Sequence, residues 1–205
     1  MIQPEPTSTM PSDKPNKIRL AIFGSGGGSN AEAIIQYFKN HPSIEVALIA
    51  TNRKNAFILE RAKKHNIPSL YLKKSSFYNQ DETVLELQSL QIHWIILAGF
   101  LWLIPKKLIQ AYPSKIINIH PALLPKYGGP GMYGKHVHTA VHAAKDSASG
   151  MSIHYVNENY DEGAIIAQFK TTLDAEDTPK DIAAKVLKLE HAHYASVIER
   201  TILDS

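Results

Sequence analysis

The segment IRLAIFGSGGGSNA, residues 18–31, decides the fold. Its first six residues form an apolar run of strand length that stops at a glycine-rich turn. After the turn, apolar side chains recur with the spacing of one helix face, at Ala31, Ile34, Ile35 and Phe38. A strand that passes through glycines into a helix is the opening unit of an open parallel sheet.

The rest of the chain repeats this alternation and then departs from it. Further strands are predicted at residues 46–51, 69–72, 94–98 and 116–120, with helices at 56–65, 81–90 and 105–111. A proline- and glycine-rich loop at 121–135 is followed by a helix at 136–144, two strands at 149–157 and 164–172, and a long helix after Thr178. The pattern predicts an α/β protein. We expect a Rossmann-like open, mostly parallel twisted sheet with helices on both faces and an antiparallel C-terminal portion.

Length and composition narrow the class of protein. The 205 residues favour one domain at 17–205, preceded by a polar stretch at 1–16 with four prolines that we expect to be a disordered extension. A net charge of +3 is too small to indicate nucleic-acid binding, and the absence of cysteine excludes disulfides and zinc–thiolate sites. No apolar run is long enough for a bilayer and no secretory signal is evident, so we expect a cytoplasmic protein.

The glycine-rich turn predicts an anion site. Glycines let the backbone approach a ligand closely, and a helix N-terminus offers free N–H groups, to which Ser29 and Asn30 add polar side chains. Gly26-x-Gly28-x-x-Ala31 also fits the loose dinucleotide pattern. The second strand ends without the acid that NAD would need, and Arg53 keeps NADP as an alternative. A simple turn capped by Ser29 or Asn30 is the third possibility.

The stretch IINIHP, residues 116–121, places polar side chains at the carboxyl end of a parallel strand. Asn118 and His120 are two apart and therefore share one face. An amide beside an imidazole suits a carbonyl substrate that becomes a tetrahedral oxyanion. For an isolated Asn-x-His, however, a satisfied polar pair is the more common explanation. Asp161, in NYDEG, has a simple turn as its alternative.

The histidines do not indicate a metal site. Of His136, His138 and His142, only the last two share a helix face, and no third ligand is evident, so no metal is predicted. His154 shares a strand face with Ser152, and we expect it to be a buried, hydrogen-bonded histidine.

With these segments located, the chain resembles the folate-dependent formyltransferases. The resemblance runs from about residue 17 to 203 in family order and is carried by GGGSN (26–30), LAGF (97–100), NIHPALLPKY (118–127), YDEG (160–163) and EHAHY (190–194).

The resemblance implies an enzyme of de novo purine biosynthesis. It would transfer the formyl group of its co-substrate 10-formyltetrahydrofolate to the amine of 5'-phosphoribosylglycinamide. The implied catalytic residues are Asn118, His120 and Asp161. The implied phosphoribosylglycinamide-binding residues are Gly28, Ser29, Asn30 and Glu190, and the implied folate-binding residues are Leu101, Trp102, Leu103, Ile104 and Asn118.

The same resemblance implies small-molecule partners only, without nucleic acid or membrane, in a monomer or homodimer, and a cis peptide at Leu124-Pro125. As a mechanism we expect the Asp161 carboxylate to raise the pKa of His120 and keep it cationic near neutrality, while the Asn118 Nδ2 group donates to the formyl oxygen.

The sequence departs from the family pattern on the folate side. Trp102 and Gln80 stand where bacterial members often carry arginine, and the 121–135 loop is long. Relatives that act on tRNA or hydrolyse the folate carry an additional domain, so the length favours the small nucleotide substrate. A formyltetrahydrofolate hydrolase and an NADP-dependent oxidoreductase remain the alternatives.

Overall fold

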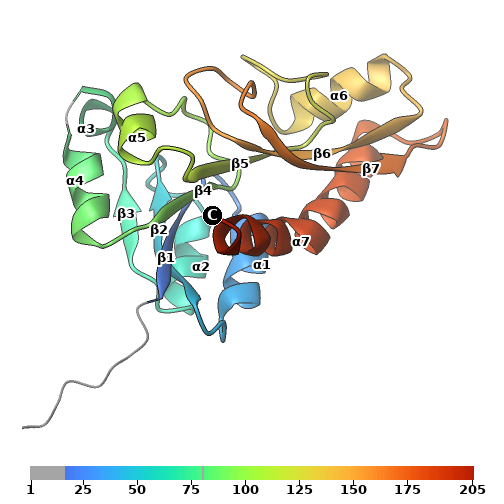
Figure 1. The fold of residues 1–205 in the computed structure, drawn as a ribbon. Helices are drawn as coiled ribbons and strands as arrows, with labels where there is room; N and C mark the ends of the chain where they lie inside the picture. The colour runs from blue at the N-terminus through green and yellow to red at the C-terminus, as the bar shows by residue number, and fades with distance from the viewer. Residues whose placement is uncertain (1–16, 80) are drawn as a thin grey trace, which may run out of the picture.

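The structure is a computed structural model that describes residues 17–79 and 81–205. The expected extension at 1–16 and the departure at Gln80 lie outside the described residues. The described part forms one seven-stranded sheet in the order β3-β2-β1-β4-β5-β6-β7, with helices packed against it (Figure 1). The elements are β1 Ile18–Phe23, α1 Ser29–Phe38, β2 Ile44–Thr51, α2 Ile58–Lys64, β3 Ser69–Tyr71, α3 Lys74–Asn79, α4 Glu82–Ser89, β4 Trp94–Leu97, α5 Lys106–Ala111, β5 Ile116–His120, α6 Lys135–Ala143, β6 Ala148–Tyr155, β7 Ile165–Thr172 and α7 Pro179–Leu203.

The sheet changes direction at β6. Strands β1 to β5 pair in parallel, whereas β6 runs antiparallel to β5, and β7 runs antiparallel to β6. The predicted fold class is therefore confirmed, including its antiparallel C-terminal portion. The switch occurs next to β5, which carries Asn118 and His120.

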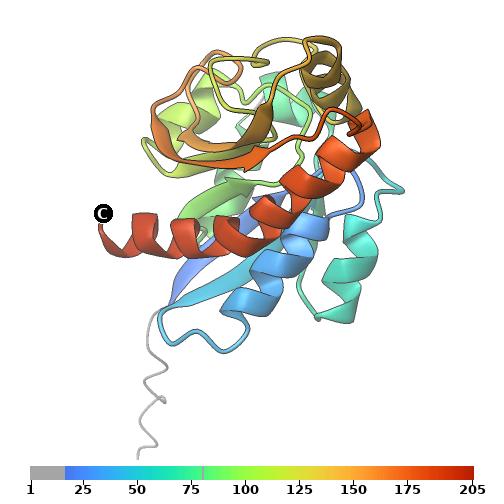
Figure 2. The same cartoon turned by 90° about the vertical axis from the view of Figure 1, so that its right-hand side faces the viewer.

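Successive residues of the central strands bury their side chains in two different cores. In β4, Ile96 belongs to the core formed with α1, α2, α6 and α7, while Ile95 and Leu97 belong to the core formed with α3, α4 and α5. All four residues of β4 are buried, as expected for a strand covered on both faces. Figure 2 shows α7 running beside α1 across one face of the sheet.

Tyr194 connects the final helix to the sheet. Its side chain is fully buried, and its hydroxyl donates to the Leu97 carbonyl at 2.9 Å and lies 3.4 Å from the Ile117 carbonyl. Burial raises the pKa of Tyr194 well above its ordinary value, so the hydroxyl remains a donor. This contact places α7 against the strands β4 and β5, at whose carboxyl ends the site lies.

The predicted boundaries differ from the observed ones by at most two residues, but helix α3 was not predicted. Its sequence, KSSFYN, contains serines and aromatic residues of modest helix propensity. The helix forms because Phe77 is buried, with its ring centroid 5.7 Å from that of Phe100 and 5.5 Å from that of Trp102.

In the described part of the chain, no helix combines the length and apolarity needed to cross a bilayer.

We expect the substitution Tyr194→Phe to lower the free energy of unfolding by about 1 kcal/mol, because it removes a buried hydrogen bond without creating a large cavity. For a chain of this size, the melting temperature should fall by roughly 2–4 °C. Thermal unfolding followed by circular dichroism measures this. Tyr71→Phe, at an exposed position of the edge strand β3, is the control. Equal stability of wild type and Tyr194→Phe would contradict the anchoring role.

Candidate active site

A cavity of about 1000 Å³ lies at the carboxyl ends of β4 and β5. Besides these strand ends, its walls include the loop at 129–134 and the first half of α7, from Pro179 to Glu190. The lining is mainly apolar, with a few polar side chains among it. This is the edge of a parallel sheet at which α/β proteins bind ligands, and the size suits a drug-sized molecule.

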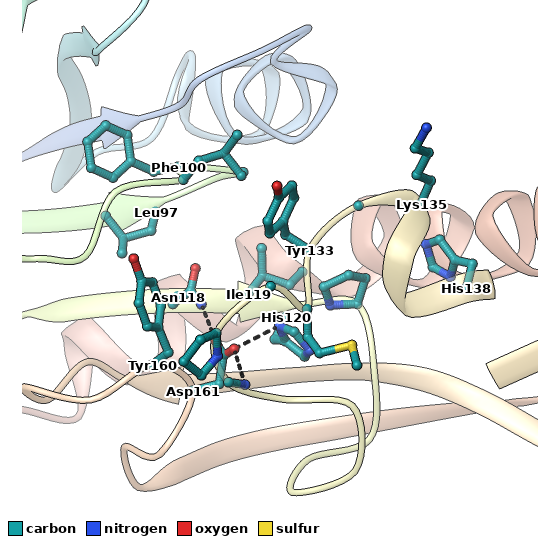
Figure 3. Close-up of a pocket in the computed structure, with 18 of the residues that line it drawn as sticks. Leu97, Phe100, Asn118, Ile119, His120, Tyr133, Lys135, His138, Tyr160 and Asp161 are labelled. Atoms are coloured by element: carbon teal, nitrogen blue, oxygen red, sulfur yellow. Dashed lines mark hydrogen bonds and ion pairs between the residues drawn. The ribbon is translucent and has the colours of Figure 1, made fainter. Parts of the chain in front are cut away.

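Asn118, His120 and Asp161 meet on one wall of this cavity (Figure 3). Strand β5 supplies the first two, and the connection between β6 and β7 supplies the third. Nδ1 of His120 lies 3.4 Å from Oδ2 of Asp161, and Nδ2 of Asn118 lies 3.4 Å from its Oδ1. Residues distant in sequence thus form one cluster, with Tyr160 beside it.

The connection between β6 and β7 holds Asp161 close to the end of β6. Asp161 has a left-handed backbone with φ 57°, and its Oδ2 accepts from the Gly129 N–H at 3.0 Å. Two residues later, a Cβ on Gly163 would lie only 1.6 Å from the Tyr155 carbonyl oxygen. Only glycine permits that approach. The Gly in NYDEG is therefore required by this backbone contact.

The His120 ring lies between two hydrogen-bond acceptors. Its Nε2 is 2.7 Å from the Tyr127 carbonyl oxygen, and its Nδ1 faces the Asp161 carboxylate. A doubly protonated ring would satisfy both partners. Burial nevertheless lowers the pKa of His120 below its ordinary value, with the Asp161 charge and the Tyr127 carbonyl opposing this effect. The expectation that Asp161 keeps His120 cationic at neutrality was therefore wrong: desolvation outweighs the charge.

Asp161 itself remains a carboxylate at neutral pH. Burial raises its pKa, but the nearby His154 and His120 and the Gly129 N–H lower it by more, so the pKa lies below the ordinary value. Such a group stabilises the fold above its unfolded pKa and loses that effect as the pH falls through its folded pKa. The site therefore contains a stable negative charge next to a mostly neutral imidazole.

The sequence interpretation of His154 as a buried, hydrogen-bonded residue is confirmed, but it missed that His154 belongs to this cluster. Nδ1 of His154 lies 2.8 Å from the Tyr155 carbonyl oxygen, and its Nε2 lies 3.0 Å from Asn118 Nδ2 and 3.6 Å from Asp161 Oδ1. If Nδ1–H donates to the carbonyl, Nε2 accepts from Asn118. We expected the Asn118 Nδ2 group to donate to a formyl oxygen. In this structure it is directed at His154 and Asp161.

The segment at 101–104 lines the cavity with all four of its residues. Ser25 and Tyr78 hold this segment in place: the Leu101 N–H donates to Ser25 Oγ at 3.0 Å, and Tyr78 Oη donates to the Leu103 carbonyl at 3.1 Å. The Trp102 ring packs against the rings of Phe77 and Tyr78, at centroid distances of 5.5 and 5.8 Å. These two aromatic residues were not predicted to support the site. The predicted cis peptide at Leu124-Pro125 is present.

The glycine loop contributes only one of its three predicted contact residues to the cavity. Asn30 lines it together with Glu190, and Asn30 Nδ2 donates to Glu190 Oε2 at 2.7 Å, whereas Gly28 and Ser29 do not line it. The N-cap of α1 is Gly28, with no side-chain cap, so neither Ser29 nor Asn30 has the capping role considered above. Within the described part of the chain, the N–H groups of this helix start are thus left without a side-chain cap.

Gly28 itself has a structural reason to be glycine. Its φ is 68°, and a Cβ there would lie 2.7 Å from the Ile58 side chain, so helix α2 packs directly on this turn. The alternative of a tight strand–helix turn therefore explains Gly28. Asn30 differs, because its Oδ1 is buried without a hydrogen-bond partner among the residues that the structure describes and is available to a ligand.

Glu190 is a buried acid without a cationic partner among the hydrogen bonds and ion pairs of the described residues. Burial raises its pKa above the ordinary value, and the hydrogen bond from Asn30 offsets part of that rise. Within the same described ranges, no three histidine, aspartate or glutamate side chains converge as metal ligands.

Comparison with known proteins gives one consistent result. The family model for formyl transferases matches residues 18–198. A phosphoribosylglycinamide formyltransferase of Bacillus subtilis is 38% identical over 189 residues, covering 90% of this chain and 94% of that protein. The chloroplastic enzyme of that name from Arabidopsis thaliana is 42% identical over 193 residues, covering 91% of this chain and 66% of the plant protein.

The chain spans 60% of a second plant relative, from Vigna unguiculata, at 39% identity. Among solved structures, phosphoribosylglycinamide formyltransferase from Bacillus halodurans superposes with a TM-score of 0.80 at 38% identity, covering 89% of this chain and 94% of that one.

We expect Glu190→Gln to raise the melting temperature at pH 7.5, because glutamine accepts the same hydrogen bond from Asn30 without burying a charge. The sign follows from the raised pKa: ionisation of Glu190 disfavours the folded state once the pH exceeds the unfolded pKa of about 4.3. Below that pH the carboxyl is neutral in both states, so the advantage should vanish at pH 4. Melting curves at the two pH values test this, and an equal gain at both would contradict it.

Proposed function

This chain belongs to the formyl transferase family, and on that premise we propose that it transfers the formyl group of 10-formyltetrahydrofolate to the amine of 5'-phosphoribosylglycinamide. The observation that carries the proposal is the meeting of Asn118, His120 and Asp161 on one wall of a cavity of about 1000 Å³. Relatives that share most of their length with this chain are named for that reaction.

The two substrates differ in character, and the cavity offers a suitable lining for each. The apolar segment at 101–104, backed by aromatic rings, suits a flat heteroaromatic folate. Asn30 and Glu190 offer hydrogen bonds to a ribose, and the uncapped N-terminus of α1 suits a phosphate. We assign Gly28, Ser29, Asn30 and Glu190 to the nucleotide, and Leu101, Trp102, Leu103, Ile104 and Asn118 to the folate.

In the proposed reaction, the substrate amine attacks the formyl carbon. An α-amine has a pKa near 8, so a usable neutral fraction exists at pH 7. As the new C–N bond forms, negative charge develops on the formyl oxygen. Asn118 and the minor, protonated form of His120 stabilise that charge, and the 3.4 Å contact from Asn118 to Asp161 is long enough for a substrate oxygen to replace it.

Protons must also move. The amine loses one proton, which Asp161 accepts directly or through water, and the folate nitrogen gains one as its bond to the formyl carbon breaks. Because burial lowers the pKa of His120, this residue gives its proton readily to the leaving folate nitrogen as the oxyanion collapses, and the proton that Asp161 accepted then returns to His120. The step is balanced without a metal or a redox cofactor.

We extend the proposal to the protein as a whole. Residues 17–205 act as one formyltransferase domain, as a cytoplasmic monomer or homodimer that binds small molecules and neither nucleic acid nor membranes. The plant relatives are named chloroplastic, so proteins of this kind work in more than one compartment.

The proposed function is tested with purified protein by following both folate product and N-formyl nucleotide, with each substrate omitted in turn. We expect product only when both are present. Formate released without the amine acceptor would instead identify a hydrolase, and no reaction with both substrates would refute the assignment.

In the same assay, His120→Ala and Asp161→Asn should each lower kcat at least about 100-fold, since each removes a group that stabilises charge or accepts a proton in the transition state. Circular dichroism should show that both variants are folded. Turnover near the wild-type rate in either variant would remove that residue from the chemistry.

Calorimetry tests the assignment of the two ends of the cavity. Ser29→Ala and Asn30→Ala should each weaken binding of phosphoribosylglycinamide, by up to about tenfold for one lost hydrogen bond, and leave folate binding within about twofold. The reverse order of effects would overturn the assignment.

A further inference from the structure

The backbone of Tyr127 makes the hydrogen bond that fixes the His120 ring. The Tyr127 carbonyl oxygen lies 2.7 Å from Nε2, on the opposite edge of the ring from Asp161. Tyr127 has a left-handed backbone, with φ 57°, which is costly for a residue that is not glycine. A carbonyl presented from such a conformation needs other contacts to hold it in place.

The same turn also contacts Asp161. Two residues after Tyr127, the Gly129 N–H donates to Asp161 Oδ2 at 3.0 Å. Residues 127–129, which we name the clamp turn, therefore touch both members of the His120–Asp161 pair. A displacement of this turn would change the orientation of both groups.

A side-chain hydrogen bond holds the clamp turn from outside the cavity. Tyr127 Oη donates to Asp146 Oδ2 at 2.9 Å, and Asp146 lies between α6 and β6. That bond lowers the pKa of Asp146, which therefore stays ionised, and Lys126 Nζ lies 3.4 Å from the same oxygen. Both Tyr127 and Asp146 line a separate pocket of about 270 Å³, and neither lines the large cavity.

We propose that the hydrogen bond between Tyr127 and Asp146 positions the catalytic pair by holding the Tyr127 carbonyl against His120. Tyr127 and Asp146 are thus positioning residues that touch no substrate. The inference rests on the proposed function for its kinetic consequence, because only correctly oriented His120 rings in the protonated form stabilise the oxyanion. If the tether is lost, the Tyr127 carbonyl is held less firmly against the ring, and the orientation of the ring becomes less restricted.

The test is a double-mutant cycle of Tyr127→Phe, Asp146→Ala and the double variant. Phenylalanine keeps the ring and removes only the hydroxyl. Each single variant should lower kcat about fivefold, the range expected for one hydrogen bond, with both KM values within twofold. The double variant should fall no further than the singles. Asp146→Asn, which keeps an acceptor oxygen, should recover most of the loss.

Tyr37→Phe is the matched control. Tyr37 is an exposed tyrosine on α1 whose hydroxyl also donates to a carboxylate, that of Glu199, and it lines neither pocket. Its removal should leave kcat unchanged. Rates are compared below the melting temperature of every variant, so that loss of folded protein does not contribute.

A second readout does not depend on catalysis. The Hε1 resonance of His120, followed by NMR against pH, should titrate at lower pH in Tyr127→Phe, because one acceptor that favours the protonated ring is loosened. The titratable groups that face His120 are Asp161, His154 and His138, and all three are unchanged in this variant.

Three results would each overturn the proposed positioning role. The first is an unchanged kcat and an unchanged His120 titration in Tyr127→Phe, and the second is a rise in KM instead of a fall in kcat. The third is a double variant whose loss of kcat equals the product of the two single losses. Inactive wild-type protein would refute the proposed function alone, because the NMR titration would still decide whether Tyr127 positions His120.

Discussion

The Asp161 carboxylate must remain charged in a buried position, and much of the surrounding structure satisfies this requirement. Taking an anion out of water costs several kcal/mol unless hydrogen bonds and opposite charge replace the lost water. Here the Gly129 N–H, the Asn118 amide and two imidazoles surround the group. Burial raises the pKa of Asp161, which the surrounding groups outweigh, and it lowers the pKa of His120. Before substrate binds, the pair is therefore an anion beside a largely neutral ring.

The change of strand direction at β6 makes this cluster possible. In the parallel part of the sheet, side chains at the carboxyl ends come from neighbouring strands that all run the same way. Because β6 runs antiparallel to β5, its register pairs Asn118 with His154. The connection that follows β6 then brings Asp161 back beside Asn118 and His120. One sheet therefore supplies a histidine from each of two opposed strands to a single carboxylate.

Much of this arrangement could be predicted from the sequence, and the exceptions have physical reasons. The apolar run at Trp94–Leu97 and the Asn-x-His pair after it follow from local periodicity. The family resemblance, rather than local periodicity, indicated that Asp161 joins them. The contribution of His154 depends on strand register, which nothing near His154 specifies. Helix α3 depends on the burial of Phe77 against residues distant in sequence. The net pKa shift of His120 was predicted with the wrong sign, because the resemblance indicated the Asp161 charge beside the ring but not the desolvation of the ring, which outweighs that charge.

The long helix α7 has a consequence for how the protein is made. Residues 179–203 complete the larger core through Ile182, Val186, Tyr194 and Ile198, and they also supply Glu190 to the cavity. While a ribosome is still adding them, the sheet face that they cover is exposed as an apolar surface on the nascent chain. Chaperone binding and aggregation are therefore most relevant before this helix has been synthesised and has docked, and the cavity can be completed only after the helix has docked.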